Sequence, residues 1–257
     1  MTQQLEKNER FSLPELSPSG RWVRAMLGGV FVADTRRALL LRRRSGPGEY
    51  VFHPSDVREE LFIERDHEKD DQLGELVVYD LDLGGRVVEK AARRLVQPQA
   101  RLSHIEGFVT FDWDAMEAWF EEDEQVYVHP RDPYHRVDAR QSSRHVRVLV
   151  DGVEVASTHR PVLCFETGLR TRYYLPKTDV RMDLLTHTDT QTQCPYKGTA
   201  EYWSVNVNGT THDDLAWSYR TPLPESQKIA GFVAFYDEKV DVYVDGVLQE
   251  RPHTKFS

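Results

Sequence analysis

Short stretches in which apolar and polar residues alternate recur along the chain and predict β-strands. Residues 146–150 and 153–155 have this pattern on either side of Asp151-Gly152. These two residues accept the positive φ angles of a two-residue turn, so the segment predicts a β-hairpin. The same turn signal follows or separates similar stretches at Gly28-Gly29, Asn208-Gly209 and Asp245-Gly246. The pattern therefore indicates a mainly β chain of antiparallel strands.

Helical signals are few. The segments Ser55–Phe62 and Thr178–Leu185 each begin with a residue type that caps helices, and they predict helices of one to two turns. The apolar residues of Asp114–Glu121 have helical spacing and predict a further helix. We expect these helices to be short additions to the strands.

The pattern occurs twice. Val23–Leu61 matches Val146–Leu184 at an offset of 123 residues, and after a one-residue insertion Gly74 matches Gly198. In this alignment, residues from Asp114 to about Glu122 are an insertion in the first copy. Residues 126–128 then match residues 242–244. We therefore predict two tandem antiparallel domains, residues 18–130 and 145–253, joined by a linker at 131–144. Gly29 and Gly152 are expected in equivalent turns.

The composition of the chain limits the classes of protein and of partner to consider. The chain has 257 residues, a net charge of -9 and 39% hydrophobic residues, which is typical of a soluble globular protein. The acidic balance argues against a nucleic-acid partner. No stretch approaches the ~18 apolar residues of a membrane helix, and residues 1–10 lack the apolar region of a signal peptide. We expect a cytoplasmic protein with no membrane partner.

Candidate chemistry lies in the second copy, in residues Cys194–Gly198. The first copy has Asp70–Leu73 where the second has Cys194–Lys197. A cation at Lys197 close to Cys194 would favour the thiolate and make it a nucleophile. The alternative is a small, inert, packed thiol with Lys197 in water. Cys164 lies in an apolar strand and is interpreted as packing.

Aromatic residues also gather in the second copy. Trp217 aligns with Arg93 and Tyr219 with Leu95 of the first copy. Such rings line concave pockets or fill a core. We expect a pocket bordered by Trp203, Trp217 or Tyr219 in the second copy or at its junction with the first.

Several further motifs agree with one family: Asp132–Asp138, Ser142-Ser143-Arg144, Arg160-Pro161, Asp179-Val180-Arg181, Cys194–Gly198 and Ala230–Tyr236. Through them nearly the whole chain resembles a tandem member of the domain-of-unknown-function 427 family, which also carries a nucleotidyltransferase label. The resemblance implies small coiled-sheet domains, similar to β-tent or sandwich-like proteins, with short helices. It also implies that His135 and Asp138 form a hydrogen-bonded pair.

Two kinds of chemistry are not expected. Nucleotidyl transfer needs paired carboxylates, and the pair Asp80 and Asp82 lies in the first copy, away from the Cys-Lys motif. A zinc site with two Cys-x-x-Cys pairs is excluded because the chain has only Cys164 and Cys194. We expect neither a metal nor a cofactor.

The leading hypothesis is a protein that binds a small molecule in its second domain, as a thiol-dependent enzyme with Cys194 as nucleophile and Lys197 as its charge partner. The alternative is a non-catalytic module that binds a ligand or partner through an aromatic pocket. In either case the expected binding residues are Thr192, Tyr196, Trp203, Trp217, Tyr219, His187, Arg181, His135 and Arg136.

Overall fold

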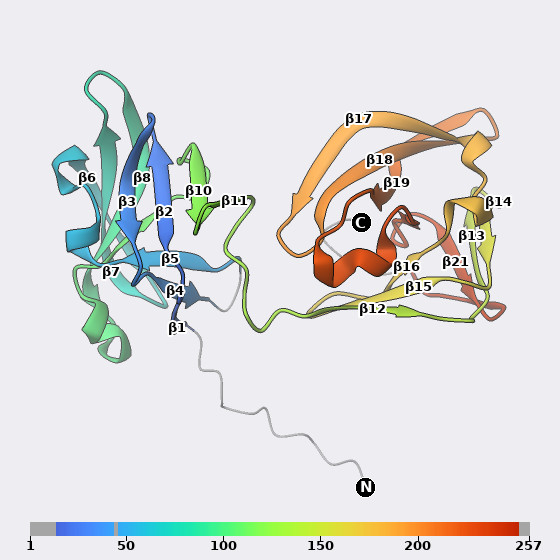
Figure 1. Cartoon of the computed structure of the whole chain (residues 1–257), viewed down its shortest axis with the longest axis horizontal. Helices are drawn as coiled ribbons and strands as arrows, with labels where there is room; N and C mark the ends of the chain where they lie inside the picture. The colour runs from blue at the N-terminus through green and yellow to red at the C-terminus, as the bar shows by residue number, and fades with distance from the viewer. Residues whose placement is uncertain (1–13, 44–45, 252–257) are drawn as a thin grey trace, which may run out of the picture. The chain divides into compact units, whose positions relative to one another are not determined.

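The computed structural model describes residues 14–43 and 46–251, so residues 1–10, on which the lack of a signal peptide was judged, lie outside it. The chain divides into two compact units between Asp132 and Pro133, named unit 1 and unit 2 (Figure 1). Both units are mainly β with antiparallel sheets and short helices, which confirms the expected fold class.

Unit 1 contains eleven strands in its described residues: β1 (Glu15–Pro18), β2 (Val23–Leu27), β3 (Val30–Thr35), β4 (Leu39–Arg42), β5 (Glu49–Phe52), β6 (Phe62–Asp70), β7 (Gly74–Asp82), β8 (Val87–Pro98), β9 (Val109–Phe111), β10 (Ala118–Glu121) and β11 (Glu124–Val126). They form a seven-stranded sheet of order β1-β4-β5-β9-β8-β7-β6 and a four-stranded sheet of order β11-β10-β2-β3.

Unit 2 repeats this set of eleven strands: β12 (Val137–Gln141), β13 (Val146–Val150), β14 (Val153–Thr158), β15 (Val162–Glu166), β16 (Arg172–Tyr174), β17 (Leu185–Cys194), β18 (Gly198–Val207), β19 (Thr210–Tyr219), β20 (Val233–Phe235), β21 (Asp241–Val244) and β22 (Val247–Leu248). Over residues 133–251 these strands form three sheets, of orders β12-β15-β16, β14-β13-β21-β22 and β17-β18-β19-β20. Within unit 2, β17 to β19 lie on one side and β12 and β15 on the other (Figure 1).

The strand registers show that the two units share one topology. Val23 lies opposite Thr35 in the β2–β3 hairpin, as Val146 lies opposite Thr158 in β13–β14. Gly29 and Gly152 occupy the turns of these hairpins with φ of 73° and 77°, values that glycine adopts without steric cost. The predicted hairpin turns and the equivalence of Gly29 and Gly152 are confirmed.

The predicted helices near residues 55–62 and 178–185 are present as pairs of single 3₁₀ turns. They are η1 (Pro54–Asp56), η2 (Glu59–Leu61), η4 (Lys177–Asp179) and η5 (Met182–Leu184). Two longer 3₁₀ helices, η3 (Ala100–Ile105) and η6 (Pro224–Ile229), follow β8 and β19.

The predicted helix and insertion at Asp114–Glu121 are wrong. This segment is a turn followed by β10, in which Trp119 lies opposite Ala25 of β2. Val242 lies opposite Val148 in the same way, so Trp119 corresponds to Val242 and the offset returns from 124 to 123. Burial of Trp119 against the core holds the segment extended, and this tertiary contact overrides the local helical spacing.

The predicted linker at residues 131–144 is also wrong in its extent. Residues 137–141 form β12, which pairs along its length with β15. Val137 and Ala139 alternate with polar residues and are buried. The Arg and Pro residues of the segment are typical of a linker, and for that reason the first strand of unit 2 was not predicted.

A hydrogen-bonded anchor is repeated in both units. Thr35 Oγ1 donates to Asp56 at 2.7 Å, and Arg37 pairs with the same carboxylate at 2.8 Å. The equivalent group in unit 2 is Thr158, Asp179 and Arg160, with the same contacts at 2.6 and 2.8 Å. The anchor ties the end of β3 or β14 to the first 3₁₀ turn of its unit.

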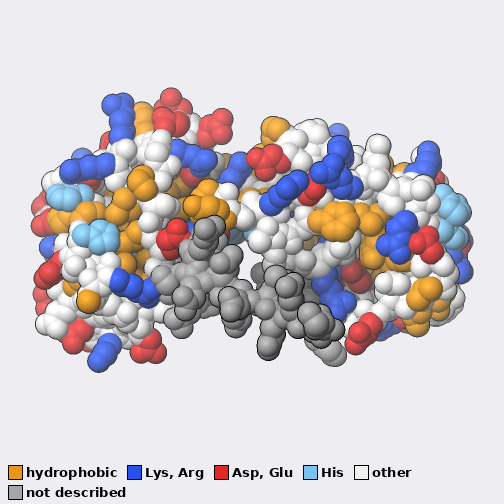
Figure 2. All heavy atoms as spheres, turned by 90° about the horizontal axis from the view of Figure 1, so that it is seen from below, with side chains coloured by type: hydrophobic (Ala, Val, Ile, Leu, Met, Phe, Trp, Pro, Cys, Tyr) orange, Lys and Arg blue, Asp and Glu red, His pale blue; other side chains and the backbone are white. Residues whose placement is uncertain are grey.

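Basic and acidic side chains are interspersed over the face shown in Figure 2. In the described part of the chain, the search for a helix long and apolar enough to span a membrane finds none.

Candidate functional site

The Cys-Pro-Tyr-Lys-Gly motif forms the turn between β17 and β18, where Cys194 lies opposite Gly198. Gly198 has a φ of +97°, which favours glycine at the end of this turn. The backbone N–H of Leu223 donates to the carbonyl of Lys197 at 3.1 Å, and Ser226 Oγ donates to that of Tyr196 at 3.4 Å. The turn is therefore held against the start of η6.

A buried charged network lies under this turn. The ammonium group of Lys197 pairs with the carboxylate of Glu166, and their side chains are 10% and 8% exposed. His135 Nε2 lies 3.0 Å from the other oxygen of Glu166. The expected pair of His135 with Asp138 is wrong, because Asp138 pairs with Arg136 and Arg140 instead. Glu166 thus connects His135 to Lys197.

The two cysteines differ in burial. Burial raises the pKa of the Cys164 thiol to about 11. Cys194 is only partly buried, and it packs at the margin of the cluster that contains Cys164. Burial on its own would lower the pKa of Lys197, but the negative charges of an ionised Cys194 and of Glu166 raise it above its usual value. Lys197 is therefore a cation, and its ammonium group lies close to both Glu166 and Cys194.

The aromatic rings near the motif pack against one another. Tyr196 stacks on His135 with ring centroids 4.0 Å apart. Trp217 Nε1 donates to the hydroxyl of Tyr174 at 3.3 Å, and Tyr219 packs in the same cluster. Thr192 lies two residues before Cys194 on β17, is exposed, and has its Oγ1 2.9 Å from the hydroxyl of Tyr202.

The other predicted binding residues lie elsewhere. Trp203 belongs to a separate hydrophobic cluster, where it contacts His187 edge-on and Lys177. Arg181 pairs with the exposed Asp183. The side chain of Arg136 is 72% exposed. The structure therefore brings together Cys194, Lys197, Tyr196, His135, Thr192, Trp217 and Tyr219, and it separates Trp203, His187, Arg181 and Arg136 from them.

The pocket expected beside Trp203, Trp217 or Tyr219 stays a prediction. These three side chains are no more than 7% exposed and pack into the hydrophobic clusters of unit 2.

Sequence reasoning missed two charged groups. Glu166 ends β15, and no local pattern marks it as the partner of Lys197. Arg172 forms ion pairs with Asp237 and Glu238 at 2.5 and 2.6 Å, and its guanidinium lies 5.6 Å from the centre of the Trp217 ring. The adjacent acidic residues Asp237-Glu238 are the only sequence signal for this group.

Unit 1 packs the corresponding positions differently. Its cluster includes Leu41, Leu73 and Leu95, where unit 2 has Cys164, Lys197 and Tyr219. Asp70, which corresponds to Cys194, accepts hydrogen bonds from the turn N–H groups of Gln72 and Leu73. The same fold therefore accommodates aliphatic side chains where unit 2 buries a thiol and an ammonium group.

The carboxylates considered for nucleotidyl transfer have structural partners. Asp80 pairs with Arg65 at 2.8 Å, and Asp82 accepts from the N–H groups of Gly84 and Gly85. In residues 14–43 and 46–251, no three His, Cys, Asp or Glu side chains are grouped to hold a metal ion.

Comparison with known proteins gives one family. The model described as Domain of unknown function (DUF427) matches residues 15–122 and again residues 138–246, one segment in each unit. No curated protein matches the chain. The resemblance inferred from the motifs, including its tandem arrangement, is confirmed.

Proposed function

We propose, for a chain that belongs to the DUF427 family, that unit 2 binds a small electrophilic molecule and that the thiolate of Cys194 attacks it. The burial of Lys197 beside Cys194 carries this proposal. An ammonium group is expensive to remove from water, and unit 1 places Leu73 at the same position. A role in stabilising a thiolate accounts for that cost.

Each member of the network has a role in this proposal. Cys194 forms the covalent bond to the ligand, whose leaving group departs with its electron pair. Lys197 stabilises the thiolate, Glu166 fixes Lys197, and His135 fixes Glu166. Thr192 lies two residues before Cys194 on β17, and in this proposal it contacts the ligand.

Alkylation with iodoacetamide tests this proposal, because the reagent forms a carbon–sulfur bond to a thiolate and releases iodide. We expect Cys194 of the native protein to react at least about ten times faster than Cys164, whose pKa is raised and whose access is blocked. The double variant Lys197→Met with Glu166→Gln removes the buried pair together and should slow alkylation of Cys194 about tenfold.

Lys228→Met removes the ammonium group of an exposed residue in the same unit, which donates to the carbonyl of Ala139 at 3.2 Å, and is the matched control. Peptide mapping identifies the modified thiol. Equal rates for the two cysteines, or an unchanged rate in the double variant, would reject a reactive Cys194. An inert Cys194 would then favour the second candidate, a non-catalytic binding module in which this thiol only packs.

We further propose that this function operates in the cytoplasm on a small molecule and not on nucleic acid, on the basis of the net charge of -9. Cell fractionation and a filter-binding assay with duplex DNA test the two parts. Recovery in a membrane or secreted fraction, or DNA binding at physiological salt, would contradict them.

A further inference from the structure

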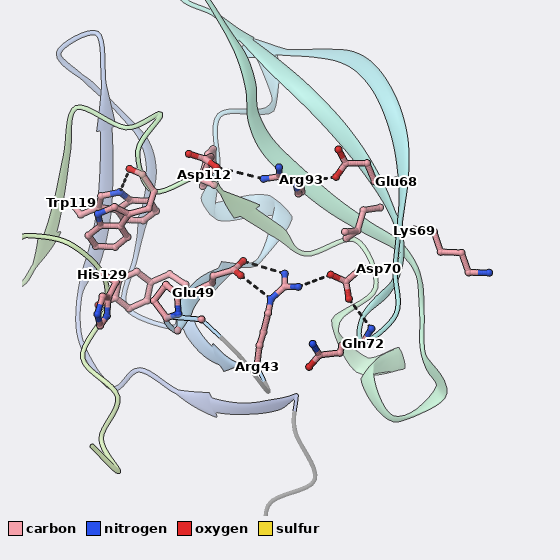
Figure 3. A pocket seen from close by; sticks show the side chains of 17 residues that line it. Arg43, Glu49, Glu68, Lys69, Asp70, Gln72, Arg93, Asp112, Trp119 and His129 are labelled. Atoms are coloured by element: carbon pink, nitrogen blue, oxygen red, sulfur yellow. Dashed lines mark hydrogen bonds and ion pairs between the residues drawn. The ribbon is translucent and has the colours of Figure 1, made fainter. Parts of the chain in front are cut away.

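A cavity of about 490 Å³ opens in unit 1, within the size range of small-molecule sites (Figure 3). Through the repeat it lies where unit 2 has the candidate site: Arg93 and Asp112 correspond to Trp217 and Tyr236. In unit 2 those two rings pack 4.6 Å apart. Two packed rings therefore stand in unit 2 where Arg93 and Asp112 border the cavity of unit 1.

One wall of the cavity is aromatic and fixed. The indoles of Trp113 and Trp119 stack with centroids 4.7 Å apart and an angle of 4° between their planes. Trp119 Nε1 donates to the carbonyl of Trp113 at 3.1 Å. Tyr50 packs 5.8 Å from Trp119, and its hydroxyl donates to Glu121. Trp113 is only partly buried, so its ring is accessible from the cavity.

The opposite wall is charged. Arg43 pairs with Glu49 at 2.8 Å and with Asp70 at 2.5 Å. The dashed contacts in Figure 3 show that each guanidinium of this wall lies between two carboxylates.

The second guanidinium, Arg93, is held more loosely. It lies 3.3 Å from Glu68 and 3.9 Å from Asp112. Lys69 also lines the cavity, but its ammonium group points away from the other labelled residues (Figure 3). Four carboxylates therefore face two guanidinium groups, and the lining carries one negative charge in excess even when Lys69 is counted.

An excess of carboxylates opposite an aromatic wall favours a cation. Carboxylate oxygens accept hydrogen bonds from an ammonium or guanidinium group, and the face of an indole attracts the same charge. An anionic ligand would have to compete with the carboxylates that already engage Arg43 and Arg93. We propose that the unit 1 cavity binds a small organic cation with a flat apolar part, which packs on Trp113 while its charged group contacts Glu68 and Asp112.

Titration of the full chain with benzylammonium tests this site, with tryptophan fluorescence and calorimetry as readouts. Benzyl alcohol and benzoate are the neutral and anionic controls of the same shape. We expect benzylammonium to bind at least tenfold more tightly than either control, and the affinity to fall as salt is added.

Three variants locate the site. Asp112→Asn and Trp113→Leu should each weaken benzylammonium binding about tenfold, whereas Glu64→Gln, an exposed change on β6, should leave it unchanged. Circular dichroism shows whether each variant is folded, and Trp113→Phe, which keeps an aromatic face, should retain most of the affinity. Equal binding of benzoate or benzyl alcohol, or unchanged binding in both Asp112→Asn and Trp113→Leu, would overturn the proposal.

Discussion

Asp56 belongs to the anchor of unit 1, and its surroundings predict that the stability of this unit depends on pH. Hydrogen bonds from Arg37, with others from Thr35 and Ser55, lower the pKa of the Asp56 carboxyl from 3.8 to about 2 although partial burial opposes this. A carboxyl whose pKa is lower in the folded than in the unfolded state stabilises the fold above the unfolded pKa. That contribution is lost as pH falls from about 4 toward 2.

Asp56→Asn should therefore lower the free energy of unfolding of unit 1 at pH 7 by ~1 kcal/mol, after allowance for solvent screening. The difference from the parent protein should shrink when urea unfolding is repeated at pH 2.5. Asp71→Asn, at an exposed residue of the same unit, is the control and should have little effect at either pH. A difference that is as large at pH 2.5 as at pH 7 would contradict the assigned role.

The sequence predicts some members of the candidate site and not others for a simple reason. Cys194 and Lys197 belong to one turn, so their proximity follows from three residues of separation. Glu166 lies 31 residues from both Lys197 and His135, and it meets them only because β15 ends beneath that turn. A long-range contact between a carboxylate and an ammonium group leaves no local pattern.

The turn before β7 and the turn before β18 place glycine at equivalent positions with unequal space around them. A Cβ at Gly74 would lie 2.1 Å from the carbonyl oxygen of Gln97, whereas a Cβ at Gly198 would meet its nearest neighbour at 3.6 Å. Both residues have a positive φ that disfavours alanine.

Gly74→Ala should therefore destabilise unit 1 by roughly 3 kcal/mol or more, because backbone must move, and Gly198→Ala should cost unit 2 only ~1 kcal/mol. Gly85 has a φ of +127° and open space around it, so Gly85→Ala in unit 1 measures the backbone strain alone, without a clash. Chemical denaturation measures all three. A smaller effect for Gly74→Ala than for Gly85→Ala would show that the hairpin adjusts freely.

The sequence predicted the hairpins well, because glycine and its neighbours mark their turns. It predicted poorly those strands that form only because they pair with another strand. The hairpins at Gly29 and Gly152 follow from glycine at positive φ, a local requirement. The strand at Ala118–Glu121 forms because it pairs with β2. The helical spacing of its apolar residues gives no sign of that pairing. β12 was missed for the same reason, since its partner β15 lies beyond an intervening hairpin.

The two units each contain their own hydrophobic clusters, so we expect each to fold when produced alone as residues 14–132 or 133–251. The shorter fragment 145–251 follows the boundary suggested by the sequence and lacks β12. It leaves β15 without its pairing to residues 137–141 and uncovers Val162 and Cys164.

Fragment 145–251 should therefore unfold at lower temperature than fragment 133–251, or fail to fold. Thermal unfolding followed by circular dichroism compares them at equal concentration. Equal melting temperatures would show that residues 133–144 add nothing to the stability of unit 2, as expected of a linker.

Repeated topology within one chain has a consequence for folding. Like strands of tandem repeats can pair in the wrong repeat, a known cause of misassembly. Arg43 and Glu49 form an ion pair in unit 1, whereas Glu166 and Arg172 hold the corresponding positions with the charges reversed.

We infer that this reversal opposes strand exchange. If β5 took the place of β16, Glu49 would replace Arg172 beside Asp237 and Glu238, and a third carboxylate would replace the guanidinium group that pairs with both. The double change Arg43→Glu with Glu49→Arg gives unit 1 the charge order of unit 2, and it should raise the fraction of exchanged oligomers after refolding, as measured by size-exclusion chromatography. An unchanged monomer yield would rule this out. On this inference, the opposite charge order at these two positions makes each strand pair less favourably in the other repeat while the chain folds.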